Sequence, residues 1–144
     1  MPRFLALFLF GAAATLAGAN GPATPPAPSV LADGHCYELR TYLAHPGRLE
    51  ALHARFRHHT NRLLEKHGMK LVGFWVPQDE GKGAENTLVY IVEHANRAAA
   101  HASWEAFRQD PEWVEARRQS ELDGPIVVKV EALFLNPTDY SRLQ

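Results

Sequence analysis

The chain has 144 residues, of which 46% are hydrophobic and 22% are charged, and this suits a single globular domain. Its 15 Lys and Arg residues are nearly balanced by 16 Asp and Glu residues, which gives a formal net charge of −1. The chain therefore lacks the basic excess that is typical of nucleic-acid-binding proteins, which argues against that class. It also gives no reason to expect electrostatic attraction to a membrane surface.

The N-terminus has the pattern of a secretory signal peptide. Arg3 supplies a positive start, residues 4–16 are apolar, and Ala17-Gly18-Ala19 offers an A-x-A cleavage site. We therefore predict a signal peptide over residues 1–19 and an exported protein, either periplasmic or secreted. The apolar stretch is shorter than the roughly 20 residues of a membrane span, so an uncleaved membrane anchor is the alternative.

Residues 20–34 are rich in proline and alanine and separate the signal from the domain. Their four prolines cannot sustain a helix or an inner strand, which predicts a flexible, partly extended leader. The folded domain is then expected over residues 35–144. Its lone cysteine, Cys36, cannot form an internal disulfide, so stability must come from a hydrophobic core. We expect a half-buried strand residue there; a reactive or intermolecular thiol would require a lowered pKa or a partner chain.

The first half of the domain predicts a strand, a helix and a hairpin. Residues 35–44 alternate as a strand, residues 48–67 have helical spacing, and strands at 69–77 and 86–94 flank a polar loop. Gly68 suits the left-handed position that ends the helix. The apolar stripe of this helix contains Leu49, Leu52, Phe56, Thr60, Leu63 and His67. Its solvated face is expected to carry Arg55, Arg57, Arg62 and Lys66.

The second half predicts two helices and a final strand. Asn96 can cap a helix that runs to Phe107, and Asp110 followed by Pro111 can begin another that runs to about residue 122. Residues 126–135 form the last strand. This order predicts a ferredoxin-like, split βαβ fold of the α+β class, with a four-stranded sheet and helices on one face only.

One face of this sheet is left without a helical cover. The second strand has Leu71 and Trp75 on one side and Val72, Phe74 and Val76 on the other, and the third strand is apolar on both sides as well. Each such side chain left in water would forgo about 1.5–3 kcal/mol. We therefore predict a homodimer through the open sheet face. The alternative is a solvated face that carries Glu38, Arg40, Glu93, Lys129 and Glu131.

Several strings of residues, in order along the chain, resemble the NIPSNAP family. They are Tyr37-Glu38-Leu39-Arg40-Thr41-Tyr42, Lys66-His67-Gly68, Val72-Gly73-Phe74-Trp75, Asp110-Pro111-Glu112-Trp113 and Pro137-Thr138-Asp139-Tyr140-Ser141. The resemblance implies a dimeric α+β barrel, in which two four-stranded sheets pack together. Eukaryotic members carry two such domains in tandem, whereas this chain has one, which favours homodimerisation. The family supplies no catalytic residue to carry over.

No motif for a phosphate, dinucleotide, zinc protease or serine hydrolase site is present. The eight histidines also lack the spacing of a metal site. His58 and His59, for example, are consecutive and would point about 100° apart on a helix. We therefore expect neither a metal nor a cofactor.

His59 and Thr60 are the leading polar candidates in the first helix. If they are buried they must form hydrogen bonds, either to the neighbouring strand or to each other's backbone. The functional alternative places His59 in a pocket between helix and sheet, with Tyr37, Trp75 and Trp104, where histidine suits proton transfer near neutral pH.

Arg40 lies on the same strand face as Glu38 and could anchor a ligand carboxylate, or pair with an acid on a neighbouring strand. Trp104, Phe107 and Trp113 could form an aromatic binding cluster or belong to the core. The candidate ligand-binding residues are thus Tyr37, Arg40, His59, Thr60, Trp75 and Trp104.

Three functions are compatible with these residues. The favoured hypothesis is a homodimeric domain that binds a small molecule or a protein. The first alternative is a cofactor-independent enzyme, monooxygenase- or isomerase-like, that uses His59. The second is a haem- or metal-associated protein with an exposed histidine. Whether the protein is an enzyme stays open.

Overall fold

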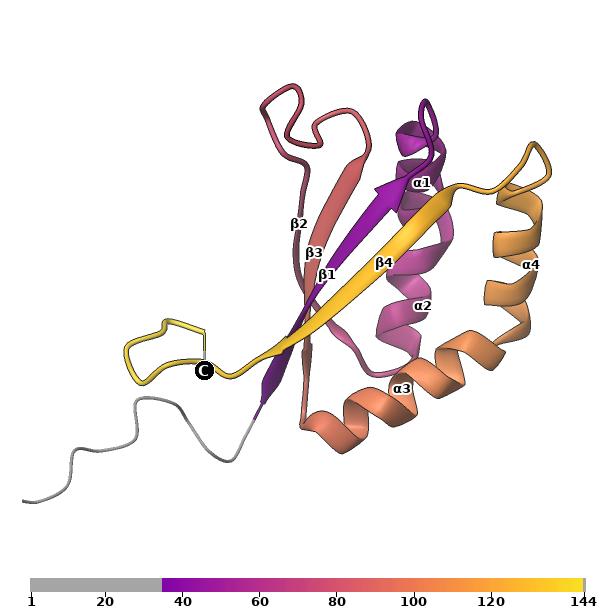
Figure 1. Ribbon diagram of the computed structural model, residues 1–144. Coiled ribbons are helices and arrows are strands. Elements are labelled where there is room, and N and C mark those ends of the chain that lie inside the picture. The colour runs from indigo at the N-terminus through magenta and orange to yellow at the C-terminus, as the bar shows by residue number, and fades with distance from the viewer. Residues whose placement is uncertain (1–34, 144) are drawn as a thin grey trace, which may run out of the picture.

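The computed structural model describes residues 35–143, so the predicted signal peptide and leader lie outside the described residues. A four-stranded antiparallel sheet has the order β2-β3-β1-β4. Figure 1 shows all the helices on one face of this sheet. The elements in chain order are β1 (Cys36–Ala44), α1 (Leu49–Arg55), η1 (Phe56–Thr60), α2 (Asn61–Lys66), β2 (Lys70–Trp75), β3 (Thr87–His94), α3 (Arg97–Gln109), α4 (Pro111–Ser120) and β4 (Val127–Leu135).

This topology confirms the predicted split βαβ arrangement. β1 and β3 are the inner strands, and β2 and β3 form the predicted hairpin around the polar loop. The first crossover, through α1 to α2, and the second, through α3 and α4, both return over the same sheet face. A one-sided helical layer follows directly from that connectivity.

The predicted helix ends are confirmed by their capping residues. The Asn96 side chain accepts a hydrogen bond from the Ala99 N–H at 2.8 Å, and the Asp110 side chain accepts one from the Glu112 N–H at 2.8 Å. Pro111 occupies the first turn of α4, where its missing N–H costs nothing. Gly68 ends α2 with a φ of 78°, a value that favours glycine.

The helix predicted over residues 48–67 is interrupted by one segment of π-helix, η1. The Asn61 N–H bonds to the carbonyl of Phe56, and the Thr60 hydroxyl donates to the carbonyl of Arg55 at 3.2 Å, each five residues back. The extra residue shifts the helical phase. Arg55, which precedes this segment and was predicted on the solvated face, is buried against Ser120 and Glu121 at the end of α4; Arg57, Arg62 and Lys66 are exposed as predicted.

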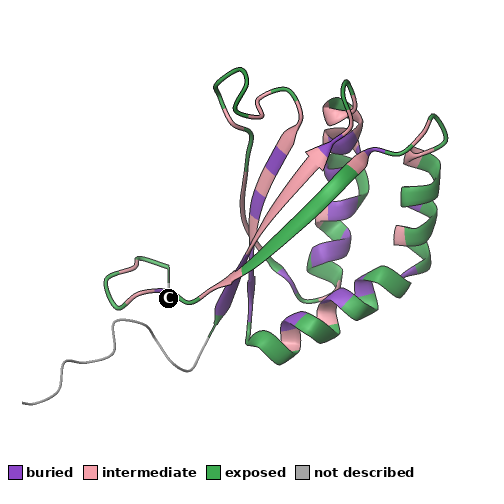
Figure 2. Ribbon diagram, viewed as in Figure 1, coloured by how far each residue is buried: buried purple, intermediate pink, exposed green. Residues whose placement is uncertain are grey.

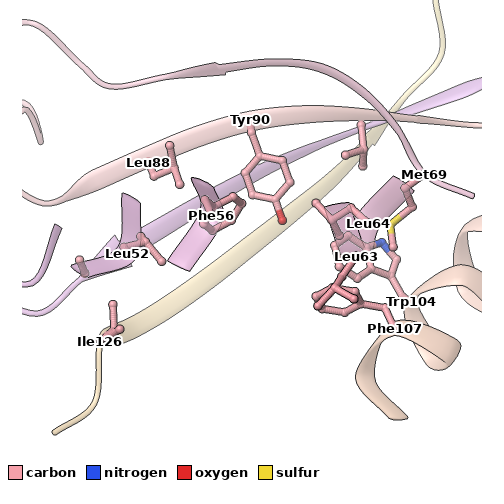
Figure 3. Packing of buried hydrophobic residues seen from close by; sticks show 12 residues of the cluster. Leu52, Phe56, Leu63, Leu64, Met69, Leu88, Tyr90, Trp104, Phe107 and Ile126 are labelled. Carbon is pink, nitrogen blue, oxygen red and sulfur yellow. The ribbon is translucent and has the colours of Figure 1, made fainter. Parts of the chain in front are cut away.

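The core lies between the helices and the inner strands (Figure 3). Phe56 from η1 packs against Tyr90 and Phe74 from the sheet, with ring centroids 5.2 and 5.8 Å apart. Trp104 and Phe107 of α3 close the other end. Figure 2 shows the contrast between these buried positions and β4, which is exposed along most of its length. The fully buried apolar residues include Leu52, Leu63, Leu64, Tyr90, Val92 and Ile126.

A bulge in β2 changes which of its side chains face the helices. Leu71 pairs with Val92 and Phe74 with Tyr90, so both face the core, and Val72 is the additional residue between them. The prediction that Leu71 and Trp75 share a face was therefore wrong. Trp75 lies on the open face, where its ring covers Gly73 so closely that a Cβ there would meet it at 2.7 Å.

The acidic and basic strand residues divide between the two sheet faces. Glu38 and Arg40 face the helices, whereas Glu93, Lys129 and Glu131 lie on the open face beside apolar residues. Of these apolar residues Leu133 is 57% exposed, and Leu39, Val89 and Ile91 are half-buried. The chain after β4 returns over the end of this face, on the side away from the helices (Figure 1), where Pro137 is buried beside Tyr37.

Candidate functional site

A cleft of about 400 Å³ opens between the sheet and the helices. Its floor comes from β1 and β4, and its walls come from α1, α3, α4 and the turn after α4. Side chains two positions apart on a strand face the same side of the sheet. Arg40 and Tyr42 of β1 therefore both point toward the helical layer and line the cleft. The lining residues are Arg40, Tyr42, Arg55, Trp104, Phe107, Arg108, Trp113, Arg117, Glu121, Pro125, Val127, Val128, Lys129 and Val130.

A buried carboxylate holds one end of this cleft in place. Glu38 is 1% exposed and accepts hydrogen bonds from Arg40 Nη1 at 2.6 Å, from the Trp104 indole N–H, and from His94 Nε2, which lies 3.0 Å away. These donors come from β1, α3 and β3. Glu38 therefore ties α3 to two inner strands and fixes the position of Arg40.

Both members of the Glu38–Arg40 pair are ionised. Burial raises the pKa of Glu38, but the bonds from His94 and Trp104 and the charge of Arg40 lower it by more, so the net shift is downward. Burial lowers the pKa of Arg40, but the neighbouring groups Tyr42, Tyr90 and Glu38 raise it by more, so its guanidinium stays protonated. The guanidinium carbon also lies 4.0 Å from the centroid of the Trp104 ring, a cation–π contact.

Arg55 holds the opposite end of the cleft. Its side chain is 3% exposed, and its Nη1 donates to a carboxylate oxygen of Glu121 at 2.9 Å and to the Ser120 hydroxyl at 3.4 Å. Its guanidinium carbon lies 5.4 Å from the centroid of the Trp113 ring. Arg55 thus joins the first helix to the end of α4 across the base of the cleft.

Aromatic rings form a continuous wall between these two arginines. Trp104 meets Phe107 edge to face at 5.6 Å, and Phe107 meets Trp113 at 4.5 Å. Trp104 and Phe107 also belong to the core. The cluster is therefore part of the core, and its remaining surface lines the cleft.

Basic side chains outnumber acidic ones along the lining. Five lining residues are basic and one, Glu121, is acidic. Their ion-pair partners add carboxylates from Glu38, Glu105 and Glu131. Five positive groups are then matched by four negative ones, which leaves a surplus of one positive charge around the cleft.

The structure brings two of the six sequence-predicted candidates together. Arg40 and Trp104 stack on each other and line the cleft. Arg40 pairs with Glu38 on its own strand instead of an acid on a neighbouring strand. Tyr37 and Trp75 lie on the other sheet face, because their strand positions alternate with those that face the helices.

His59 does not lie in a pocket between helix and sheet. It is exposed, and its ring is 6.4 Å from that of His58, so the predicted grouping of His59 with Tyr37, Trp75 and Trp104 is wrong. Thr60 is buried, and its hydroxyl donates to the Arg55 carbonyl, a partner that is neither on the neighbouring strand nor in the backbone of His59. Consecutive helical residues point about 100° apart, so Thr60 can face the core while His59 faces solvent.

Four cleft residues carried no clear signal in the sequence. Arg55 was assigned to solvent, and Tyr42, Arg117 and Glu121 come from a strand, a helix and a turn far apart in sequence. For the pair Arg55 and Glu121 the separation is 66 residues. The only signal of this contact in the sequence is the opposite charge of Arg55 and Glu121, and many other pairs of residues in the chain share that pattern.

Within residues 35–143, no cluster of three His, Cys, Asp or Glu side chains is arranged to hold a metal ion. The helices of this part of the chain are also too short and too polar to cross a membrane. Cys36 is buried, and burial raises the pKa of its thiol by more than the charge of Arg97 lowers it.

A family model described as NIPSNAP matches residues 37–142. The chain belongs to the NIPSNAP family. No curated protein matches it.

Solved NIPSNAP structures share the fold of this NIPSNAP domain. A family protein of unknown function from Agrobacterium tumefaciens is 20% identical with a TM-score of 0.69, over 81% of this chain and all of that one. A second protein from the same organism is 18% identical with a TM-score of 0.66, over 78% and 93% of the two chains. A NIPSNAP-like domain protein from Burkholderia xenovorans is 19% identical with a TM-score of 0.64, over 74% and 88%. At these identities the likeness concerns the fold alone.

Proposed function

We propose that this NIPSNAP domain is a binding protein for a small molecule with an apolar or aromatic body. The observation that carries the proposal is the cleft of about 400 Å³ with its wall of Trp104, Phe107 and Trp113. Ligand sites are concave, mostly apolar, and equipped with a few fixed polar groups. Arg40 and Arg55 are such groups, because ion pairs and ring contacts hold both in place.

Binding is better supported than acid–base catalysis. No histidine is among the lining residues within the described part of the chain, and His59 lies elsewhere on the surface. Most of the charged lining residues are arginines, whose guanidinium groups attract and orient a ligand rather than exchange protons.

The binding proposal can be tested by filling the cleft. Val128 lines the cleft and Val114 lies on α4 outside it, and each is 54% exposed, so they form a matched pair. Small aromatic and apolar compounds would be screened against the protein by thermal shift. At 100 times its Kd a ligand adds about 2.7 kcal/mol of stability. Hits should lose their effect in Val128→Trp and keep it in Val114→Trp; hits that survive Val128→Trp would contradict the proposal.

We also propose that the domain works as a homodimer through the open sheet face. The support is the apolar surface that no helix covers, including Leu133 at 57% and Trp75 at 50% exposure. Such a dimer would leave most of the cleft accessible, because the cleft lies on the helical side of the sheet and reaches the open face only at Lys129 on the edge strand β4. The signal-like residues 1–19 support export of this dimer.

Sedimentation of Leu133→Lys tests the dimer. We expect a dimer for the natural protein at micromolar concentration and a folded monomer for Leu133→Lys, with Val114→Lys as the exposed control that stays dimeric. A natural protein that is monomeric and stable at that concentration would contradict this proposal, but not the proposal of ligand binding.

A further inference from the structure

Arg40 and Arg55 use their guanidinium groups in the same incomplete way. Each binds a protein carboxylate through Nη1, and each has a buried Nε that forms no hydrogen bond within residues 35–143. The hydrogen bonds of this region also leave Nη2 of both residues unengaged. Nε and Nη2 lie along one edge of the planar group, so both arginines leave the same edge without a partner.

That edge has the shape of a carboxylate receptor. Its two N–H groups are parallel and match the two oxygens of a carboxylate in a bidentate, charge-assisted pair. A guanidinium has donors and no acceptor, so its partner must supply oxygen lone pairs. A buried donor that stays unpaired is unfavourable, and a ligand that satisfies it gains correspondingly.

Arg40 is the better placed of the two to meet a ligand. Its side chain is 16% exposed, whereas that of Arg55 is 3% exposed and closes the base of the cleft against Ser120 and Glu121. Arg40 also stacks on Trp104, so an aromatic ring attached to the bound carboxylate would lie along the aromatic wall. Arg55 then contributes positive potential from the far end.

The charge around the cleft favours a ligand with a single negative charge. The lining groups and their partners have a surplus of one positive charge, so a monoanion balances it, while a cation adds repulsion. We propose that the ligand is a planar aromatic monocarboxylate whose carboxylate binds the Nε and Nη2 edge of Arg40. This inference rests on the proposed function, because it names the ligand class of the same cleft.

Three probes of the same size can separate shape from charge. They are 2-naphthoate, the neutral 2-naphthylmethanol and the cationic 2-naphthylmethylammonium, each titrated by calorimetry into the protein. We expect 2-naphthoate to bind about tenfold or more tightly than the alcohol, the change given by one charge-assisted pair, and the ammonium to bind weakest.

Arginine-to-lysine variants test the edge itself, because lysine keeps the charge and lacks the planar fork. Arg40→Lys should lower the affinity for 2-naphthoate by about tenfold more than it lowers that for 2-naphthylmethanol. Arg55→Lys should have a smaller effect. Arg62→Lys is the control, since Arg62 is exposed on α2 and pairs with Glu112 outside the cleft.

The outcomes distinguish this inference from the proposed function. If the alcohol or the ammonium binds as tightly as 2-naphthoate, and Val128→Trp abolishes that binding, the cleft is a ligand site and the carboxylate inference is wrong. If Arg40→Lys binds 2-naphthoate as well as the natural protein, Arg40 is not the anchor. If none of the three probes binds, both the inference and this view of the cleft fail. The comparison of the probes needs no variant, so it stands even if Arg40→Lys does not fold.

Discussion

Replacing Glu38 by Gln removes the charge that holds the cleft together while keeping its size. Glu38 is 1% exposed and receives bonds from three residues, Arg40, His94 and Trp104. A glutamine side chain has one acceptor oxygen and an NH2 group, so part of its amide would point a donor at donors. Arg40, with its guanidinium fixed in the same place, would lose its partner carboxylate.

The cost follows from the burial of the pair. Removing one partner of a buried ion pair destabilises a protein by about 3–5 kcal/mol. The remaining amide oxygen still accepts one bond, and the Arg40 side chain is 16% exposed, so we expect about 3 kcal/mol. For a domain of this size that is a fall in Tm of about 10–15 °C.

Thermal and urea unfolding of Glu38→Gln measure this cost, with Glu105→Gln as the control. Glu105 lies on α3 and pairs with Arg108 on the surface, where ion pairs contribute little, so its variant should unfold like the natural protein. A double-mutant cycle with Arg40→Met isolates the pair. If Glu38→Gln unfolds within 2 °C (about the effect of a surface pair) of the natural protein, the buried-carboxylate explanation is refuted.

The loss of stability caused by Glu38→Gln should depend on pH in a defined direction. The folded-state pKa of Glu38 lies below its usual value of 4.5, so its stabilisation is present above the pKa of the unfolded chain and is lost as pH falls through the folded-state pKa. The difference in stability between the natural protein and Glu38→Gln should therefore be constant at neutral pH and shrink in acid. A difference that grows in acid would contradict this.

Two further substitutions and one thiol reaction test the rest of the fold. Leu52→Ala, at a position that is fully buried, should cost about 2–5 kcal/mol in urea unfolding, and a cost below 1 kcal/mol would contradict the packing described. Gly73→Ala should displace the Trp75 ring and change the tryptophan emission with a loss of stability of about 1 kcal/mol or less, whereas an unchanged spectrum would contradict the close contact. Cys36, buried and with a raised thiol pKa, should react with a disulfide reagent only after unfolding; rapid reaction of the native protein would refute its burial.

Local signals predicted most of the secondary structure. The alternation of strands and the capping residues Asn96, Asp110 and Gly68 act within a few residues, so the element ends lie within about two residues of those expected. The order of elements then restricts the topology to the split βαβ arrangement, since that is a common solution for one helical layer on a four-stranded sheet.

Two one-residue insertions in the regular structure have no local signal in the sequence. The π-helical segment Phe56–Thr60 and the bulge at Val72 each change the side to which later residues point. Both depend on packing between segments distant in sequence, because a regular helix or strand would satisfy the local preferences equally well. The bulge is why Trp75 does not share a face with Leu71, whereas Arg55 is buried because the end of α4 and the turn after it pack against α1.

The candidate site was predictable in part. Arg40 and Glu38 share a face because they are two residues apart on a strand, and Trp104 follows the periodicity of its helix. The contribution of Arg55 and its partner Glu121 required the packing of α1 against the end of α4. Periodicity along one element cannot specify such a contact between two elements.

The three tryptophans allow the most direct test of the cleft as the ligand site. Trp104 and Trp113 line it, whereas Trp75 lies on the open sheet face and serves as an internal reference. In nitrogen–proton NMR spectra each indole N–H gives its own signal. Titration with 2-naphthoate should shift the signals of Trp104 and Trp113 and leave that of Trp75 in place. Saturable shifts confined to Trp75, or none in any indole, would contradict the account.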